Sequence, residues 1–120
     1  MAGHLLSVSY DWSLLVTRDL VLRKAGYTVT SALGFVDAIR LCREIKYDLA
    51  IIGHSIPLHD QQALLEEIRN SSNAPVLSVF RSSDGALQGA DYSLEGMEGP
   101  DALVSAVHRA MARRLRAKSA

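Results

Sequence analysis

The sequence has little of what marks several classes of protein. Its 120 residues include one cysteine, so no disulfide can form within the chain. The longest apolar run, Leu49–Ile52, is far shorter than the roughly 20 residues of a membrane span, and no signal peptide is visible. Thirteen basic and thirteen acidic residues cancel, so bulk charge does not favour nucleic acid or membrane as a partner. We expect a single cytoplasmic domain over residues 1–120.

What is present is an alternation of short apolar strands with amphipathic helices. Strands are predicted over 5–9, 27–30, 48–52, 75–80 and 91–94, and helices over 11–25, 35–46, 60–70 and 100–116. The order predicts an α/β domain, a parallel sheet with helices on both faces. Residues 81–90 are too poor in apolar spacing to predict a full helix.

Local patterns give finer expectations. In the first helix, Leu15 and Leu22 are predicted to face the core while Arg18 faces solvent. Asp60 is a plausible N-cap for the third helix, and residues 32–34 are expected to turn. Cys42 lies on the apolar face of the second helix and is interpreted as a small core residue, with a reactive thiol as the alternative.

The buried strand 48–52 ends at Gly53-His54-Ser55. In an open parallel sheet, ligands bind beyond the carboxyl ends of the strands. This loop is therefore the place where a functional site is expected.

Several motifs, in order along the chain, resemble those of the receiver domain of bacterial response regulators, which has the CheY-like, flavodoxin-like fold. They are Gly26-Tyr27-Thr28-Val29, the segment 32–39, Asp48–Ile52 before the position of the phosphoacceptor, Pro57 and Asp60 after it, Ile68-Arg69, Pro75-Val76-Leu77 and Gly89-Ala90-Asp91. The resemblance implies a five-stranded parallel sheet. The short segment between Phe80 and Gly89 leaves the family's fourth helix shortened or absent.

The residues that would carry the family's chemistry are missing. The resemblance implies an aspartate nucleophile where this chain has Gly53, and a metal-binding acidic pair where it has Ser9 and Tyr10. The family's Ser/Thr falls on Phe80, and its Lys-Pro pair falls near Gly96-Met97, or its Lys on Glu95 if the short loop shifts by one residue. No lysine occurs between Lys46 and Lys118. We therefore predict a degenerate pseudo-receiver that is not an enzyme and uses no metal or cofactor.

The vacated site leaves two interpretations of its aromatic residues open. Tyr10 and Phe80 are expected to fill or cover the space that metal and phosphate would occupy, either as a plug or as contacts to a ligand. Gly53 would leave room for that ligand.

Other patterns have weaker support. Gly53-His54-Ser55-Ile56-Pro57 approaches a nucleophile elbow, but Pro57 replaces the last glycine. A metal site of His54, His59 and Asp60 is weighed against plain surface groups, which we prefer. The basic cluster at the end of the chain is interpreted as complementing the dipole of the last helix, with phosphate or acidic partners as the alternative: Arg109, Arg113, Arg114, Arg116 and Lys118.

The main functional hypothesis is signal transduction through phosphorylation-independent protein–protein interaction. The partner would be a histidine kinase, a regulator or a second copy of the chain, as in a homodimer. The alternative is a small-molecule sensor that uses the emptied pocket. The expected contacts lie in the carboxyl-end loops: Tyr10, Asp11, Trp12, His54, His59 and Arg81.

Overall fold

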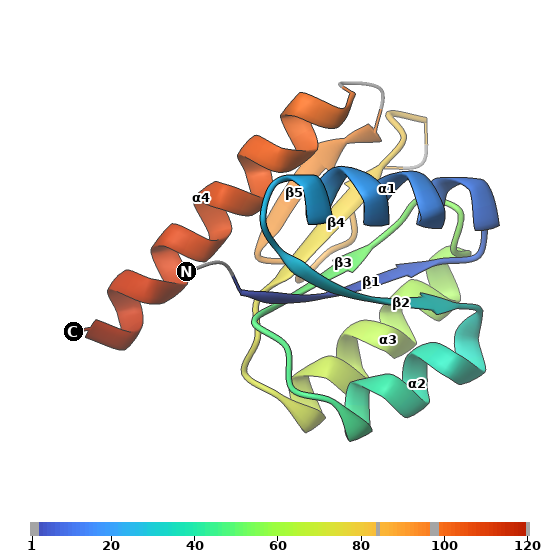
Figure 1. Ribbon diagram of the computed structural model, residues 1–120. Helices are drawn as coiled ribbons and strands as arrows, with labels where there is room; N and C mark the ends of the chain where they lie inside the picture. Colours follow the sequence, from blue (N-terminus) through green and yellow to red (C-terminus); the bar gives the residue numbers. More distant parts are fainter. Residues whose placement is uncertain (1–2, 84, 97–98, 120) are drawn as a thin grey trace.

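Five short strands form one parallel sheet in the order β2-β1-β3-β4-β5 (Figure 1). The strands are β1 (His4–Ser9), β2 (Thr28–Leu33), β3 (Leu49–Ile52), β4 (Val76–Phe80) and β5 (Tyr92–Glu95). The helices are α1 (Trp12–Lys24), α2 (Phe35–Glu44), α3 (Leu58–Ser71) and α4 (Pro100–Ser119). This computed structural model describes residues 3–83, 85–96 and 99–119.

Helices cover both faces of the sheet, with α1 and α4 on one side and α2 and α3 on the other (Figure 1). Two apolar cores result, one that includes Leu22 and Val107 and one that includes Ala38 and Leu64. Every residue of β3 is buried, as expected for a central strand of a parallel sheet. The predicted α/β architecture is confirmed. None of the helices in the described residues combines the length and apolar character that crossing a bilayer requires.

Helix α1 begins and ends where the sequence predicts, but one of its faces was assigned wrongly. Asp11 caps its first turn, and Gly26 follows its end with a φ of 103° that favours glycine. Arg18, predicted to face solvent, is buried with 7% of its surface exposed. The reason is its position: three residues after Leu15 and four before Leu22, it shares their inward-facing stripe.

Two further local predictions are corrected. Ala32 and Leu33 belong to β2 and do not turn, because β2 continues to pair with Val8 and Ser9 of β1. The turn comes at Gly34, whose φ is 89°. Asp60 is not an N-cap: α3 begins at Leu58 after Pro57, and Asp60 lies in its first turn.

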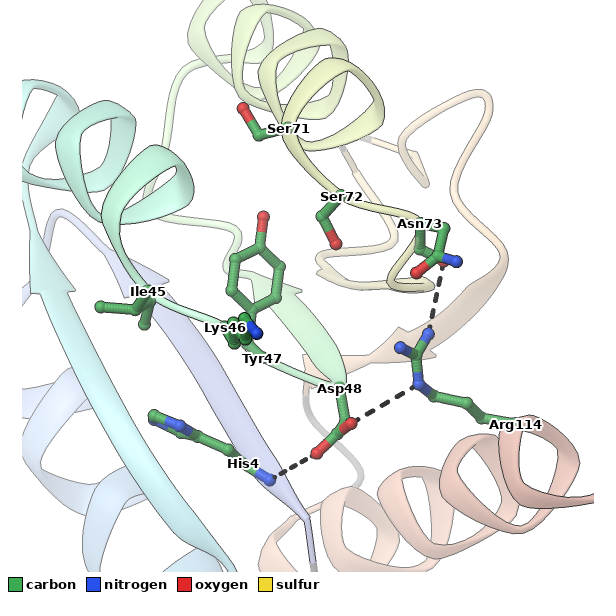
Figure 2. Close-up of a pocket in the computed structure, with 9 residues that line it drawn as sticks. All are labelled: His4, Ile45, Lys46, Tyr47, Asp48, Ser71, Ser72, Asn73 and Arg114. Atoms are coloured by element: carbon green, nitrogen blue, oxygen red, sulfur yellow. Dashed lines mark hydrogen bonds and ion pairs between the residues drawn. The ribbon is translucent and has the colours of Figure 1, made fainter. Parts of the chain in front are cut away.

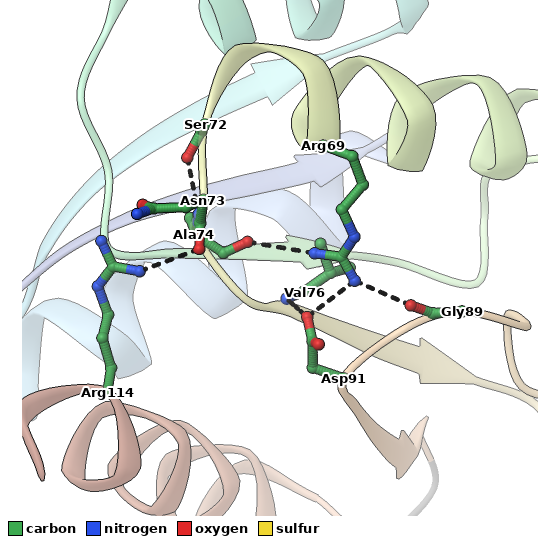
Figure 3. A network of polar contacts seen from close by, with 8 residues as sticks. All are labelled: Arg69, Ser72, Asn73, Ala74, Val76, Gly89, Asp91 and Arg114. Atoms are coloured by element: carbon green, nitrogen blue, oxygen red, sulfur yellow. Dashed lines mark hydrogen bonds and ion pairs between the residues drawn. The ribbon is translucent and has the colours of Figure 1, made fainter. Parts of the chain in front are cut away.

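The connection from β4 to β5 contains no helix in its described residues, 81–83 and 85–91. Instead, its second half is tied to neighbouring elements (Figure 3). Arg69 at the end of α3 donates to the Gly89 carbonyl at 2.9 Å and to Asp91 at 3.0 Å. Asp91 also accepts from the Val76 amide at 2.7 Å. Leu87, 3% exposed, joins the core below α3. These contacts hold the segment where a helix would otherwise pack.

Candidate functional site

The loops after β1 and β3 meet at the carboxyl edge of the sheet and are bound together by serine side chains. The Ser55 hydroxyl accepts a hydrogen bond from the Tyr10 amide at 2.9 Å and lies 2.9 Å from the Ser9 hydroxyl. Ser9, at one position of the missing acidic pair, is 0% exposed and also bonds to the backbone of Asp11. Ser9 and Ser55 therefore give the site a fixed frame without any charge.

Beside Gly53, the side chain of Arg18 brings a cation close to the backbone. A Cβ atom built on Gly53 would lie 2.5 Å from Nη1 of Arg18 and 3.3 Å from the Val8 carbonyl oxygen. The backbone of Gly53 has no positive φ, so glycine is not required there by conformation. A Cβ at this position would require the end of the Arg18 side chain to move.

The guanidinium of Arg18 is buried, and in the described part of the chain not all of its N–H groups have hydrogen-bond acceptors. Its Nη1 has no hydrogen-bond partner among the residues that the structure describes. Burial lowers the pKa of the Arg18 guanidinium, and the negative charge of Asp11 partly opposes that shift. An arginine remains charged under ordinary conditions, so the site carries a desolvated positive charge.

The carboxylate of Asp11, next to Tyr10 at this edge, is already engaged. Asp11 accepts a hydrogen bond from the Leu14 amide at 3.1 Å as the N-cap of α1. Within the described part of the chain, no group of three His, Cys, Asp or Glu side chains is placed to hold a metal ion. His59 lies 3.3 Å from its neighbour Asp60 with its side chain 93% exposed. These positions fit a capped helix and a surface pair better than a Mg²⁺ site.

Neither predicted aromatic fills the space directly beside Gly53. The Tyr10 hydroxyl donates to Asp60 at 2.9 Å, so this side chain lies against α3. Burial, together with that hydrogen bond and the nearby charge of Asp60, raises the pKa of Tyr10. Phe80 is half-buried at the end of β4. The expected empty space next to Gly53 is corrected, because Arg18 occupies it.

A cavity of about 160 Å³ opens beside Arg18, between α1, the carboxyl ends of the strands and the start of α4. His54 lines it from the loop after β3, and Gly96 lines it after β5. Gly96 is the predicted position of the family's lysine, and Met97, which follows it, is outside the described residues. Glu95, the alternative position, ends β5. The apolar walls are supplied by Leu14, Val79, Leu94 and Leu103.

Outside this cavity, the predicted contact residues form an accessible rim. Trp12 is 65% exposed at the start of α1, and Arg81 is exposed after β4. Asp11 and His59 are exposed as well, whereas Tyr10 and His54 are half-buried. The structure thus brings these six residues to one edge, with Trp12 as its largest exposed apolar group.

A larger pocket, about 520 Å³, lies at the opposite, amino edge of the sheet (Figure 2). In it, Asp48 accepts from the His4 amide at 2.9 Å and lies 3.6 Å from Nε of Arg114. Arg114, predicted as part of a basic cluster, also donates to the Asn73 carbonyl at 3.3 Å (Figure 3). These contacts join α4 to the sheet, and we assign this pocket a structural role.

The comparisons with known proteins agree on the fold. No family model matches the sequence, and no curated protein does. A solved structure named adenylate cyclase from Rhodopirellula baltica is similar at a TM-score of 0.85 and 16% identity, over 99% of this chain and 94% of that one. A CheY-like response regulator receiver domain from Methanospirillum hungatei is similar at a TM-score of 0.78 and 18% identity, over 97% of this chain and 98% of that one.

A third structure is the receiver domain of the sensor histidine kinase PA1611 from Pseudomonas aeruginosa, with a magnesium ion in its active-site cleft. It is similar at a TM-score of 0.78 and 20% identity, over 93% of this chain and 99% of that one. Together with the sheet order, these likenesses show that the chain has the CheY-like, flavodoxin-like fold. Identities this low establish shared architecture and not shared chemistry.

Arg18 is the site residue that sequence reasoning missed. None of the family's motifs includes position 18, because Arg18 lies in the middle of α1 and only its side chain reaches the site. Its helical spacing from Leu15 and Leu22 was the available indication, because that spacing places an arginine among core residues.

Proposed function

We propose that this chain is a receiver-like signalling domain that works without accepting a phosphoryl group, by binding another protein at its carboxyl edge. One observation carries the proposal: a buried arginine lies against Gly53, the residue predicted to stand at the phosphoacceptor position. An acyl phosphate needs a carboxylate nucleophile and a divalent cation to offset the charge of the transferring group. Here the position offers no side chain at all.

The loops around the site favour a binding role over catalysis. Ser55, the serine of the elbow-like motif, is engaged with Ser9 and the Tyr10 amide. The exposed rim combines Trp12, His59 and Arg81, and aromatic and arginine side chains dominate the energetics of protein interfaces. We propose a histidine kinase, a regulator or a second copy of the chain as the partner.

The first test is chemical. The purified protein is incubated with Mg²⁺ and a small phosphodonor such as acetyl phosphate, and its intact mass is measured. We expect no gain of a phosphoryl group, whereas an active receiver domain treated alongside gains one. A stoichiometric phosphoryl adduct on this chain would overturn the proposal.

The second test concerns the binding edge. Immobilised wild type is compared with Trp12→Ala/His59→Ala for retention of proteins from the native cytosol, and sedimentation measures self-association. Lys46→Ala, exposed at the amino edge, is the matched control. We expect a stoichiometric partner, or a dimer, that the double variant loses and the control keeps. If the double variant retains it fully, the interface lies elsewhere.

A further inference from the structure

Arg18 poses a problem of charge that the protein-binding role does not solve. Its side chain is more than nine-tenths buried, with 7% of the residue exposed, and its Nη1 has no acceptor among the described residues. A buried cation without a hydrogen-bonded partner is strongly unfavourable. Replacing this arginine by an apolar residue would remove that cost, so the unpaired group calls for an anion from outside the chain.

The adjoining cavity has the dimensions and polarity of a binding site for such an anion. Its volume is about 160 Å³, and cavities of roughly 150 Å³ accept a molecule the size of benzene. Arg18 and His54 are its only side chains that can carry charge among the described lining residues, and its other walls are mostly apolar. A ligand that fits has one negative group and a compact apolar body.

We propose that this cavity binds a small organic carboxylate, with its carboxylate group accepting from Arg18 and its apolar body against Leu14, Leu94 and Leu103. This inference goes beyond the proposed protein interaction and does not depend on it. A single carboxylate matches the planar donor fork of arginine. Inorganic phosphate, with more charge and no apolar part, would leave the leucine walls unfilled and several oxygens without donors.

The surroundings support this location over the other pocket. The one carboxylate that acts electrostatically on Arg18 is Asp11, and its side chain accepts from the Leu14 amide as a helix cap. At the amino edge, Nε of Arg114 also lacks a hydrogen bond within the described residues, but it has the Asp48 carboxylate 3.6 Å away as an ion pair. The carboxyl edge is therefore the place where an added anion completes a charge pair.

The experiment titrates the full chain with benzoate and butyrate by calorimetry, with benzamide as the neutral isostere and inorganic phosphate as the other oxyanion. We expect saturable binding of at least one carboxylate and none of benzamide. Arg18→Met should weaken binding at least tenfold, whereas Lys24→Met, which removes an exposed positive charge from the same helix, should leave it unchanged.

Amide chemical shifts of wild type during the same titration keep the proposal falsifiable if Arg18→Met does not fold. We expect the shifts to concentrate at His54, Gly96 and Leu103. Shifts at Lys46 and Asp48 instead, binding of phosphate alone, equal affinity for benzamide, or no binding of either carboxylate would each overturn the proposal. Loss of a protein partner in the retention experiment would leave these outcomes unaffected, so the two proposals fail separately.

Discussion

Nη1 of Arg18 lies 2.5 Å from the point where any side chain at position 53 would begin, so a side chain there would have to move the end of Arg18. In the wild type the guanidinium occupies space that a Cβ at position 53 would need. This relationship links the middle of α1 to the end of β3.

The steric part of this relationship can be measured with Gly53→Ala. We expect the substitution to lower the free energy of unfolding by about 1–2 kcal/mol, because the arginine end must move within a packed site. In an Arg18→Ala background, the same substitution should cost less than about 0.5 kcal/mol. Urea denaturation of the four proteins gives the coupling, and equal costs in both backgrounds would show that the contact is unimportant.

The electrostatic part can be separated by comparing Gly53→Asp with Gly53→Asn. The two side chains are nearly isosteric, but only the aspartate can pair with the buried cation. We expect Gly53→Asp to be more stable than Gly53→Asn by about 1 kcal/mol at pH 7. Because Arg18 would lower the pKa of the new carboxyl, this advantage is present above its unfolded pKa and disappears as pH falls through the folded value.

Thermal unfolding of both variants between pH 7 and pH 3 tests the sign. A difference that grows on acidification would contradict a charge pair between the new carboxyl and Arg18. We also expect Gly53→Asp to gain no phosphoryl group from acetyl phosphate and Mg²⁺, because Ser9 and Tyr10 supply no carboxylates for the metal.

The contact between α3 and β5 should matter for stability more than its exposure suggests. Asp91 accepts from the buried Val76 amide at 2.7 Å as well as from Arg69. Asp91→Ala leaves that amide without its side-chain acceptor, and we expect a loss of about 1–3 kcal/mol in the free energy of unfolding. Asp91→Asn keeps an acceptor oxygen and should lose less. If both variants have the same urea midpoint of unfolding as wild type, the network in Figure 3 contributes nothing to stability.

Cys42 should be unreactive in the folded protein. Burial raises the pKa of its thiol from 9.0 to about 11. At pH 8 we expect a maleimide to label a Ser13→Cys variant once, at the exposed new thiol, and to label Cys42 only after guanidinium unfolding. Mass spectrometry counts the adducts, and rapid labelling of native wild type would contradict this expectation.

The same pKa shift predicts a direction for stability in alkali. The thiol stays protonated in the folded state at pH values where the unfolded chain has already ionised. Its contribution is therefore complete below pH 9.0 and is lost as pH rises through about 11. Cys42→Ala should show a shallower decline of unfolding free energy over this range than wild type, and an identical slope would show that the thiol is not involved.

Local patterns predicted most of the fold because each element carries its own evidence. Gly26 follows α1 with a positive φ that favours glycine, and Pro100 begins α4, where its missing N–H costs no hydrogen bond. Both residues mark helix ends through their own backbone preferences. The uniformly apolar run of β3 is typical of a short strand covered on both faces.

The candidate site was harder to predict because its central contact joins two elements. Gly53 was identified from its place after β3, but a sequence does not show what packs against an absent side chain. Arg18 was assigned to solvent by its residue type, although its helical position places it inward. Likewise, Asp60 is a residue type typical of N-caps. The N-cap is Pro57, however, and Asp60 lies within the first turn of α3, where it accepts a hydrogen bond from Tyr10. Such contacts depend on how close α1 and α3 approach the sheet.

The connection between β4 and β5 has two parts that should differ in how well they tolerate an insertion. Leu87 is buried and Gly89 is held by Arg69, whereas Ser82 and Ser83 are exposed. A peptide epitope or a small reporter domain grafted between the two serines would emerge from the fold without passing through either core. The same edge that carries the candidate site thus offers an attachment point from which its occupancy can be followed.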